Sequence, residues 1–156
     1  MCEKMITLYP IEKKDIKAIT QWPKYTGVHA QMDYAIRKNG WLDCFCGIPS
    51  NYCFVAKIKD LCVGFSLLIN KNKHEAEFRI AVHPDFVGSG YGKQIIRKTL
   101  EIGFVKHRLN VISLIVRKNN PIAHRLYLDF GFTQQGETKE NIQGKDIEFF
   151  VMKICK

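Results

Sequence analysis

The sequence predicts a single α/β domain built on a mixed sheet, and three observations carry this prediction. Residues 52–82 hold three β-type runs in succession, residues 93–105 carry apolar side chains at helical spacing, and residues 111–116 are β-branched and apolar. The length of 156 residues suits one domain with its own core. With 46% hydrophobic and 25% charged residues, the composition excludes an intrinsically disordered chain.

The elements that the pattern predicts alternate between strands and helices. They are a strand over 5–9, helices over 12–19 and 30–38, strands over 52–58, 61–69 and 75–82, a helix over 93–105, a strand over 111–116, a helix over 121–130 and a strand over 146–154. The first strand stops at Pro10, and Ile16 and Ile19 give the first helix its apolar stripe. Between residues 21 and 49 aromatic side chains are scattered among polar ones, so little beyond a helix near 30–38 is indicated there.

The middle strands are predicted from turn chemistry and from alternation. The dipeptide Lys59-Asp60 joins two apolar runs by a tight connection, which is typical of a hairpin. In residues 75–82 apolar side chains alternate with charged ones that include Glu77 and Arg79. This period of two indicates a strand with one polar face.

The later elements follow from helical spacing, apolar content and capping. Ile96 and Leu100 lie one helical turn apart in the first of the two later helices. The run 111–116 is apolar throughout, as expected of a strand buried on both faces. The helix over 121–130 starts with Asn120 as its N-cap.

The chain is basic, with 24 Lys and Arg against 15 Asp and Glu and a formal net charge of +9. Such a balance favours nucleic acids, membrane surfaces or anionic ligands as partners. No apolar run approaches the ~20 residues of a membrane span, and residues 1–10 carry charges where a signal peptide has its apolar stretch. We therefore expect a cytoplasmic protein without membrane contact.

The six cysteines should be free thiols, because the cytoplasm is reducing. Cys53 and Cys62 lie in apolar β-type runs and should pack as small buried side chains. Cys44 and Cys46 are spaced C-x-C, and no second pair of Cys or His residues follows at the sequence spacing of metal ligands. We expect no metal site.

A glycine-rich segment, residues 82–93, joins the end of a predicted strand to the start of a helix. Such a loop turns backbone N–H groups toward one point, and the helix dipole adds positive character, so the loop suits phosphate oxygens. A Walker A motif is excluded because Val87 replaces its first glycine and Gln94 its Ser or Thr. A Rossmann fingerprint that starts at Gly88 places Lys93 at its third glycine and is excluded as well.

The same segment resembles the acetyl-CoA loop of the GNAT N-acetyltransferases, whose pattern is Q/R-x-x-G-x-G/A. Gly90-x-Gly92 matches the end of that pattern, and Gly88 matches a glycine that is common within it. Residues 81–85 resemble the segment that leads into the loop. Val87 departs from the pattern, because the family usually has Arg or Gln there.

A second motif of the family, N-x-x-A-x-x-L-Y followed by G-F, is matched by Asn120, Ala123, Leu126, Tyr127, Gly131 and Phe132. The two motifs occur in the family's order, and the resemblance covers about residues 75–154. It implies a central, splayed, mostly antiparallel sheet flanked by helices, in one domain over residues 1–156. The cofactor motifs would lie within 75–132 and the acceptor-site helices within 12–49.

The resemblance also implies acetyl-CoA as co-substrate, no metal, and direct acetyl transfer to a primary amine in a ternary complex. The residues expected to bind acetyl-CoA are Ala81, Val82, Val87, Gly88, Ser89, Gly90, Tyr91, Gly92, Lys93 and Asn120. The thioester carbonyl would lie near the N–H of Val82, and Tyr127 would protonate the leaving thiolate. Packing within the helix is the alternative role for Tyr127.

Two roles are open for the residue that matches the family's base. Glu77 stands where some protein-lysine acetyltransferases of the family carry a catalytic glutamate, yet Arg79 on the same face could hold it in an ion pair. Because many family members deprotonate the amine through water, Glu75 also stays a candidate.

The acceptor is open among a small-molecule amine, a protein amine and, as in basic toxin members of the family, an aminoacyl-tRNA. Asp33 and Asp43 are the acidic residues of 21–49, too few for the acidic cleft that a small cationic drug prefers. The basic residues that would either meet the phosphates of CoA or form a solvated face are Lys93, Arg97 and Lys118. The rival function is a non-catalytic module that binds acetyl-CoA or RNA, and the resemblance also makes a homodimer possible.

Overall fold

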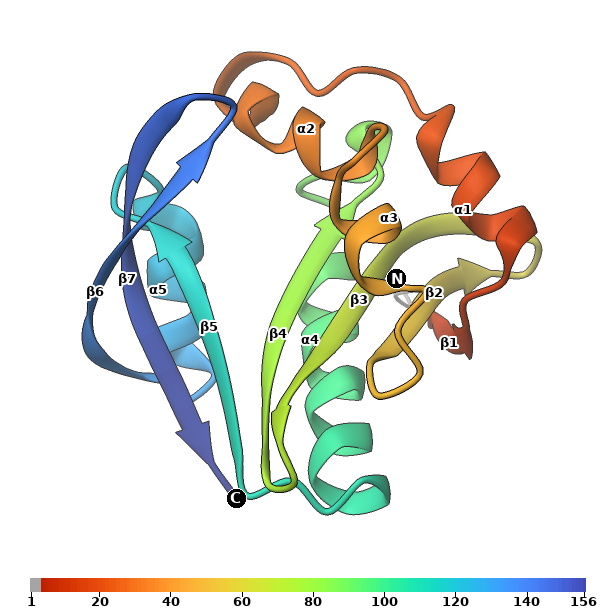
Figure 1. Cartoon of the computed structure of the whole chain (residues 1–156). Coiled ribbons are helices and arrows are strands. Elements are labelled where there is room, and N and C mark those ends of the chain that lie inside the picture. Colours follow the sequence, from red (N-terminus) through yellow and green to blue (C-terminus); the bar gives the residue numbers. More distant parts are fainter. Residues whose placement is uncertain (1–3) are drawn as a thin grey trace.

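In the computed structural model, which describes residues 4–156, seven strands form one sheet (Figure 1). The strands are β1 (Thr7–Pro10), β2 (Tyr52–Ile58), β3 (Leu61–Asn72), β4 (Glu75–Val82), β5 (Val111–Arg117), β6 (Thr133–Ile142) and β7 (Lys145–Cys155). Their order across the sheet is β1-β2-β3-β4-β5-β7-β6, and only the neighbours β4 and β5 are parallel among the pairs described. The predicted mixed, mostly antiparallel sheet is therefore confirmed.

The strands β4 and β5 diverge along their length. They pair only where residues 75–77 lie beside residues 111–113. Beyond this point the two strands separate, and Figure 1 shows them opening like a V toward their C-terminal ends. Residues 78–82 of β4 therefore have no strand partner on the side of β5, which is the splay that the family resemblance implies.

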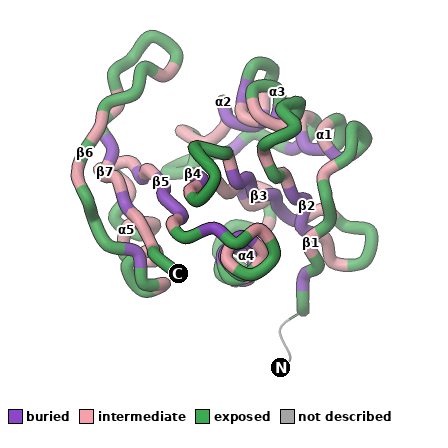
Figure 2. Tube along the Cα trace, turned by 60° about the horizontal axis from the view of Figure 1, so that its bottom comes forward, coloured by how far each residue is buried: buried purple, intermediate pink, exposed green. Residues whose placement is uncertain are grey.

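Helical elements cover both faces of the sheet (Figures 1 and 2). They are α1 (Lys13–Thr20), η1 (Gly27–Met32), α2 (Asp33–Ile36), α3 (Trp41–Phe45), η2 (Pro84–Phe86), α4 (Tyr91–Glu101), η3 (Ile102–Lys106) and α5 (Pro121–Asp129). The segment from α1 to α3 packs on one face, whereas α4 and α5 share a core on the other. Within residues 4–156, no helix has both the length and the apolar content to cross a membrane.

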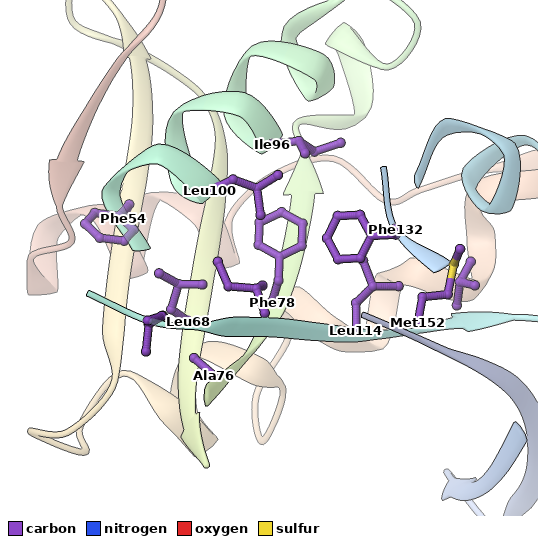
Figure 3. Packing of buried hydrophobic residues seen from close by; sticks show 12 residues of the cluster. Phe54, Leu68, Ala76, Phe78, Ile96, Leu100, Leu114, Phe132 and Met152 are labelled. Carbon is purple, nitrogen blue, oxygen red and sulfur yellow. The ribbon is translucent and has the colours of Figure 1, made fainter. Parts of the chain in front are cut away.

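Alternation along the strands divides the core between these two layers. Phe65 of β3 packs with the residues of α1–α3, and Leu68 of the same strand packs with α4. Figure 3 shows the α4 cluster, in which Phe78 of β4 lies beside Leu100 and Phe132. This packing supports β4 on α4 in the region where β5 has moved away.

The structure corrects the predicted elements in two places. The sequence prediction misses β6, because its side chains are polar and mostly exposed and it pairs with β7 alone, at the edge of the sheet. The helix predicted over 30–38 is wrong in its bounds, since the chain forms the 3₁₀ turn η1, the short α2 and a further helix, α3. Gly40 divides α2 from α3 in a turn so tight that a Cβ would collide with backbone oxygens.

The cysteines that the structure describes are free thiols, as predicted. Cys53 and Cys62 are half-buried at the border of the core under α1–α3, so they are less enclosed than predicted. Cys44 is exposed.

Candidate active site

The loop between β4 and α4 has a shape that depends on two glycines. Gly88 and Gly90 have φ values of 87° and 90°, in the left-handed region that favours glycine. Ahead of them, Nδ1 of His83 accepts a hydrogen bond from the N–H of Asp85 at 3.0 Å and caps η2. Gly90 is the N-cap of α4 and no side chain caps this helix, so the N–H groups of its first turn are open to an anion.

The side chains of the loop are turned partly into the fold. The hydroxyl of Ser89 donates to the carbonyl of Phe86, and the ring of Tyr91 packs against Phe86 with 5.9 Å between centroids. Gly92 lies in the first turn of α4, and Lys93 is exposed beside it. The groups that this loop offers to a ligand are therefore mainly backbone N–H groups.

Val87 and Gln94, the residues that exclude a Walker A motif, have different surroundings. Val87 has an extended backbone and a side chain that is 37% exposed. Gln94 is buried: its Oε1 accepts from the N–H of Ile6 at 3.0 Å, and its Nε2 donates to the carbonyl of Lys4 at 2.9 Å. Gln94 therefore fastens the segment before β1 to α4.

The end of β4 directs alternate backbone groups into the splay. The N–H of His83 donates to the carbonyl of Val63 at 2.8 Å, so the odd-numbered residues of β4 turn their polar backbone groups toward β3. The backbone N–H and C=O of Ala81 accordingly point toward β3, whereas those of Val82 point into the splay between β4 and β5. There the hydroxyl of Tyr25 donates to the carbonyl of Val82 at 2.5 Å. Burial raises the pKa of Tyr25, so this hydroxyl keeps its proton.

The helix α5 places Asn120 and Tyr127 on the opposite wall of the splay. Asn120 is the N-cap, as predicted: its Oδ1 accepts from the N–H of Ala123 at 3.2 Å. The ring of Tyr127 packs edge-on against Phe132, with 5.7 Å between centroids. Burial raises the pKa of Tyr127, which keeps its hydroxyl protonated well into alkaline pH.

A cavity of about 310 Å³ occupies the splay. The diverging strands line it with Arg79 and Arg117 among others, α5 adds Asn120 and Tyr127, and the segment from η1 to α3 adds Trp41 and further side chains. Within residues 4–156, no group of three or more His, Cys, Asp and Glu side chains could hold a metal ion.

Glu77 forms the ion pair that competes with a catalytic role. One oxygen of its carboxylate lies 2.9 Å from both Nε and Nη2 of Arg79. The guanidinium of Arg79 in turn lies 5.1 Å from the ring of Trp41 and 4.9 Å from that of Phe45. Arg79 lines the cavity, whereas Glu77 is not among the residues that line it.

The other charged candidates differ in their partners. Glu75 is held by two lysines, with N–O distances of 3.6 and 3.7 Å. Lys118 lies 2.9 Å from a carboxylate oxygen of Glu137, which raises the pKa of the lysine. Lys93 and Arg97 are exposed on α4 and form no ion pair with any carboxylate of the described residues.

Several site residues lie outside the sequence motifs. Tyr25 and Trp41 belong to the aromatic residues that are scattered over 21–49. The high density of aromatic residues in this segment is the sequence feature that could have indicated a binding surface. Arg117 is the last residue of β5, which the sequence predicts only as a buried strand. Its place on the cavity wall depends on the divergence of β5 from β4, which no local pattern reveals.

The sequence model of the acetyltransferase (GNAT) family matches residues 15–132, which include both motifs and the splayed strands. The chain belongs to the GNAT acetyltransferase family. Among curated family members, it is similar to the spermidine N(1)-acetyltransferase of Vibrio cholerae, with 34% identity over 83 residues, 53% of this chain and 44% of that protein. The corresponding enzyme of Escherichia coli K12 is 33% identical over 69 residues, 44% of this chain and 37% of that protein. The chain thus covers less than half the length of these curated relatives.

Solved structures of the family share the fold over nearly the whole chain. A chimera of the Vibrio cholerae spermidine N-acetyltransferase SpeG superposes with a TM-score of 0.78 at 25% identity, covering 97% of this chain and 95% of that chain. The Vibrio cholerae spermidine N-acetyltransferase in complex with CoA and spermine gives a TM-score of 0.73 at 23% identity, again over 97% and 95%. Other structures of the Vibrio cholerae enzyme are dodecameric or contain manganese ions.

Proposed function

We propose that the protein is an acetyl-CoA-dependent N-acetyltransferase that moves the acetyl group directly to a primary amine in a ternary complex. One observation carries the proposal: Asn120 and Tyr127 line the cavity in the splay, and β4, which borders that splay, leads directly into the glycine loop and the capless start of α4. Membership of the GNAT family and the amine-acetylating activity named for its relatives support the reaction class.

The backbone groups would position acetyl-CoA. The N–H groups of residues 87–93 would bind the pyrophosphate, helped by the dipole of α4. The N–H of Val82 faces the gap and would bind the thioester carbonyl, where developing negative charge is stabilised. Asn120 uses its Oδ1 as the helix cap, so its amide nitrogen would donate to the pantetheine arm.

Tyr127 would act as the general acid. As the amine attacks the thioester carbon and the C–S bond breaks, the sulfur needs a proton. Tyr127 lines the cavity, and its hydroxyl is protonated at neutral pH, so the proton is present when the thiolate leaves. The ammonium of the acceptor would lose its proton through water, while Glu77 holds Arg79 in the cavity wall.

Two measurements on the full chain test the proposal. Calorimetric titration with acetyl-CoA should give one site, and thermal unfolding at a hundredfold Kd should show about 2.7 kcal/mol of added stability. Release of free CoA should then depend on an added amine, screened over small amines, a peptide and an aminoacyl-tRNA. Binding of acetyl-CoA without release for every amine would favour the non-catalytic module. Absence of acetyl-CoA binding would contradict both the enzyme and a module that binds acetyl-CoA.

A further inference from the structure

We infer that the acceptor of this site is a small primary amine that also carries an oxyanion group, and that Arg117 binds that group. The inference rests on the proposed function, because it names the class of amine that the same cavity takes. It starts from the charges that line the cavity and from the surroundings of one arginine.

In the part of the chain that the structure describes, the cavity in the splay is lined by two positive side chains and one negative side chain. The charged side chains that line it among the described residues are Arg79, Arg117 and Glu140. Arg79 is neutralised by Glu77 at 2.9 Å. Glu140 is exposed on β6, and no ion pair within residues 4–156 joins it to Arg117.

Arg117 is held in place without using most of its hydrogen-bonding capacity. Its guanidinium lies 5.9 Å from the ring of Phe149, and its Nη2 donates one long hydrogen bond of 3.4 Å to the carbonyl of Gln31. A guanidinium has five N–H donors in a planar fork that matches carboxylate and phosphate oxygens. Arg117 is half-buried, so its charge is only partly screened by water.

The position of Arg117 connects it to the reacting groups. Its carbonyl accepts a hydrogen bond from the N–H of Asn120 at 3.0 Å, and Asn120 begins the helix that carries Tyr127. Arg117 therefore borders the same cavity as the proposed general acid, three residues before the helix cap. An anion on Arg117 would lie in the same cavity as Asn120 and Tyr127.

A second hollow, of about 620 Å³, continues the cavity outward and shares Arg117 with it. Its charged lining comprises Asp33, Arg37, Lys38, Arg117 and Lys145. Asp33 and Arg37 neutralise one another through hydrogen bonds of 2.9 and 3.1 Å. Lys38 and Lys145 are exposed and have no ion pair among the described residues, so the hollow keeps its positive charge.

These charges disfavour a polyamine. A polyamine would bring several ammonium groups beside Arg117, Lys38 and Lys145, where like charges repel. An amine with a carboxylate or a phosphate would instead pair its anion with Arg117 and place its amine toward the splay. The chain would then differ in acceptor from the spermidine acetyltransferases that it resembles.

Matched amines test the inference through rates and through binding. The pairs are γ-aminobutyrate against butylamine and phosphoethanolamine against ethanolamine, with spermidine as the polyamine probe. Initial rates of CoA release give kcat and KM for each amine, and saturation-transfer NMR on the protein loaded with CoA reports binding without turnover. The anion-bearing amine of at least one pair should bind about tenfold more tightly than its partner and than spermidine. The pair that shows the difference tells carboxylate from phosphate.

The variant Arg117→Gln removes the guanidinium and should raise KM for the preferred amine about tenfold, with the affinity for acetyl-CoA unchanged. Arg125→Gln removes the same charge from the exposed face of α5 and should leave KM unaltered. Preference for spermidine, equal binding within both pairs, or equal KM in the two variants would overturn the inference. Preferential binding of the anionic amine without any acetyl transfer would support the inference and contradict the proposed function.

Discussion

The hydroxyl of Tyr25 donates a hydrogen bond of 2.5 Å to the carbonyl oxygen of Val82, at the point where β4 has lost β5 as a partner. Tyr25 is 6% exposed and packs in the core under α1–α3. The contact therefore connects that layer to the strand end at which the proposed reaction takes place, and it fixes the peptide that follows Val82.

Tyr25→Phe should loosen this strand end. Loss of the donor leaves the Val82 carbonyl without this partner, so the unfolding free energy should fall by about 1 kcal/mol. The affinity for acetyl-CoA should fall several-fold, because Val82 is proposed to bind the thioester carbonyl. Urea unfolding and calorimetry measure the two effects. Tyr9→Phe, at a residue 47% exposed on β1, is the matched control and should change neither.

Gly88→Ala should damage the loop that is proposed to bind pyrophosphate. The space around Gly88 is open, but its φ of 87° costs an alanine about 1 to 2 kcal/mol. The loop should shift to relieve this strain, and acetyl-CoA should bind at least about tenfold more weakly by calorimetry. Gly136 also has open space around it but lacks a positive φ, so the variant Gly136→Ala should bind acetyl-CoA with unchanged affinity. Equal affinity in the two variants would exclude the loop from binding.

Glu77→Gln should act through Arg79. The substitution removes the charge that holds the guanidinium against Trp41, so we expect a loss of about 1 kcal/mol in unfolding free energy. Because Glu77 does not line the cavity, the shape of the kcat profile against pH should match that of the unmodified protein. A rate loss confined to low pH would instead identify Glu77 as the base. Glu75→Gln, two residues earlier on the same face of β4, is the comparison variant.

Asp33→Asn should remove stability that depends on pH. The hydrogen bonds from Arg37 hold the pKa of the Asp33 carboxyl below its ordinary value. A lowered pKa in the folded state stabilises the protein above the unfolded pKa, and this contribution is lost as the pH falls through the folded pKa. Urea unfolding should therefore show a loss of about 1 kcal/mol at pH 7 that shrinks below about pH 4. A loss that stays constant with pH would contradict this assignment, and Asp60→Asn in the exposed turn should show none.

Local patterns predicted most of the fold. The alternation in β4 and the cap at Asn120 are short-range signals, and the structure confirms both. The sequence did not predict β6, because this strand has exposed side chains on both faces and is ordered by pairing with β7. The sequence did not predict α3, because this helix has only five residues and depends on the tight turn at Gly40.

The candidate site was predictable only where a motif lies within one loop or one helix. The glycines of the loop and Tyr127 could be found in this way. Tyr25 and Arg117 could not, because each enters the site from a distant segment, one through a contact across 57 positions and the other through the divergence of β5. Such residues become visible only when the topology brings the segments together.

The most direct test of the proposed acyl transfer compares the unmodified protein with Tyr127→Phe in single-turnover release of CoA, with calorimetry of acetyl-CoA on both. The variant lacks the proton that the leaving sulfur is proposed to take but keeps the ring that packs on Phe132. We expect amine-dependent release by the unmodified protein, a rate about a hundredfold lower in the variant, and the same affinity for acetyl-CoA in both. Equal rates in the two proteins would contradict the role of Tyr127, and absence of acetyl-CoA binding to the unmodified protein would contradict the proposed function itself.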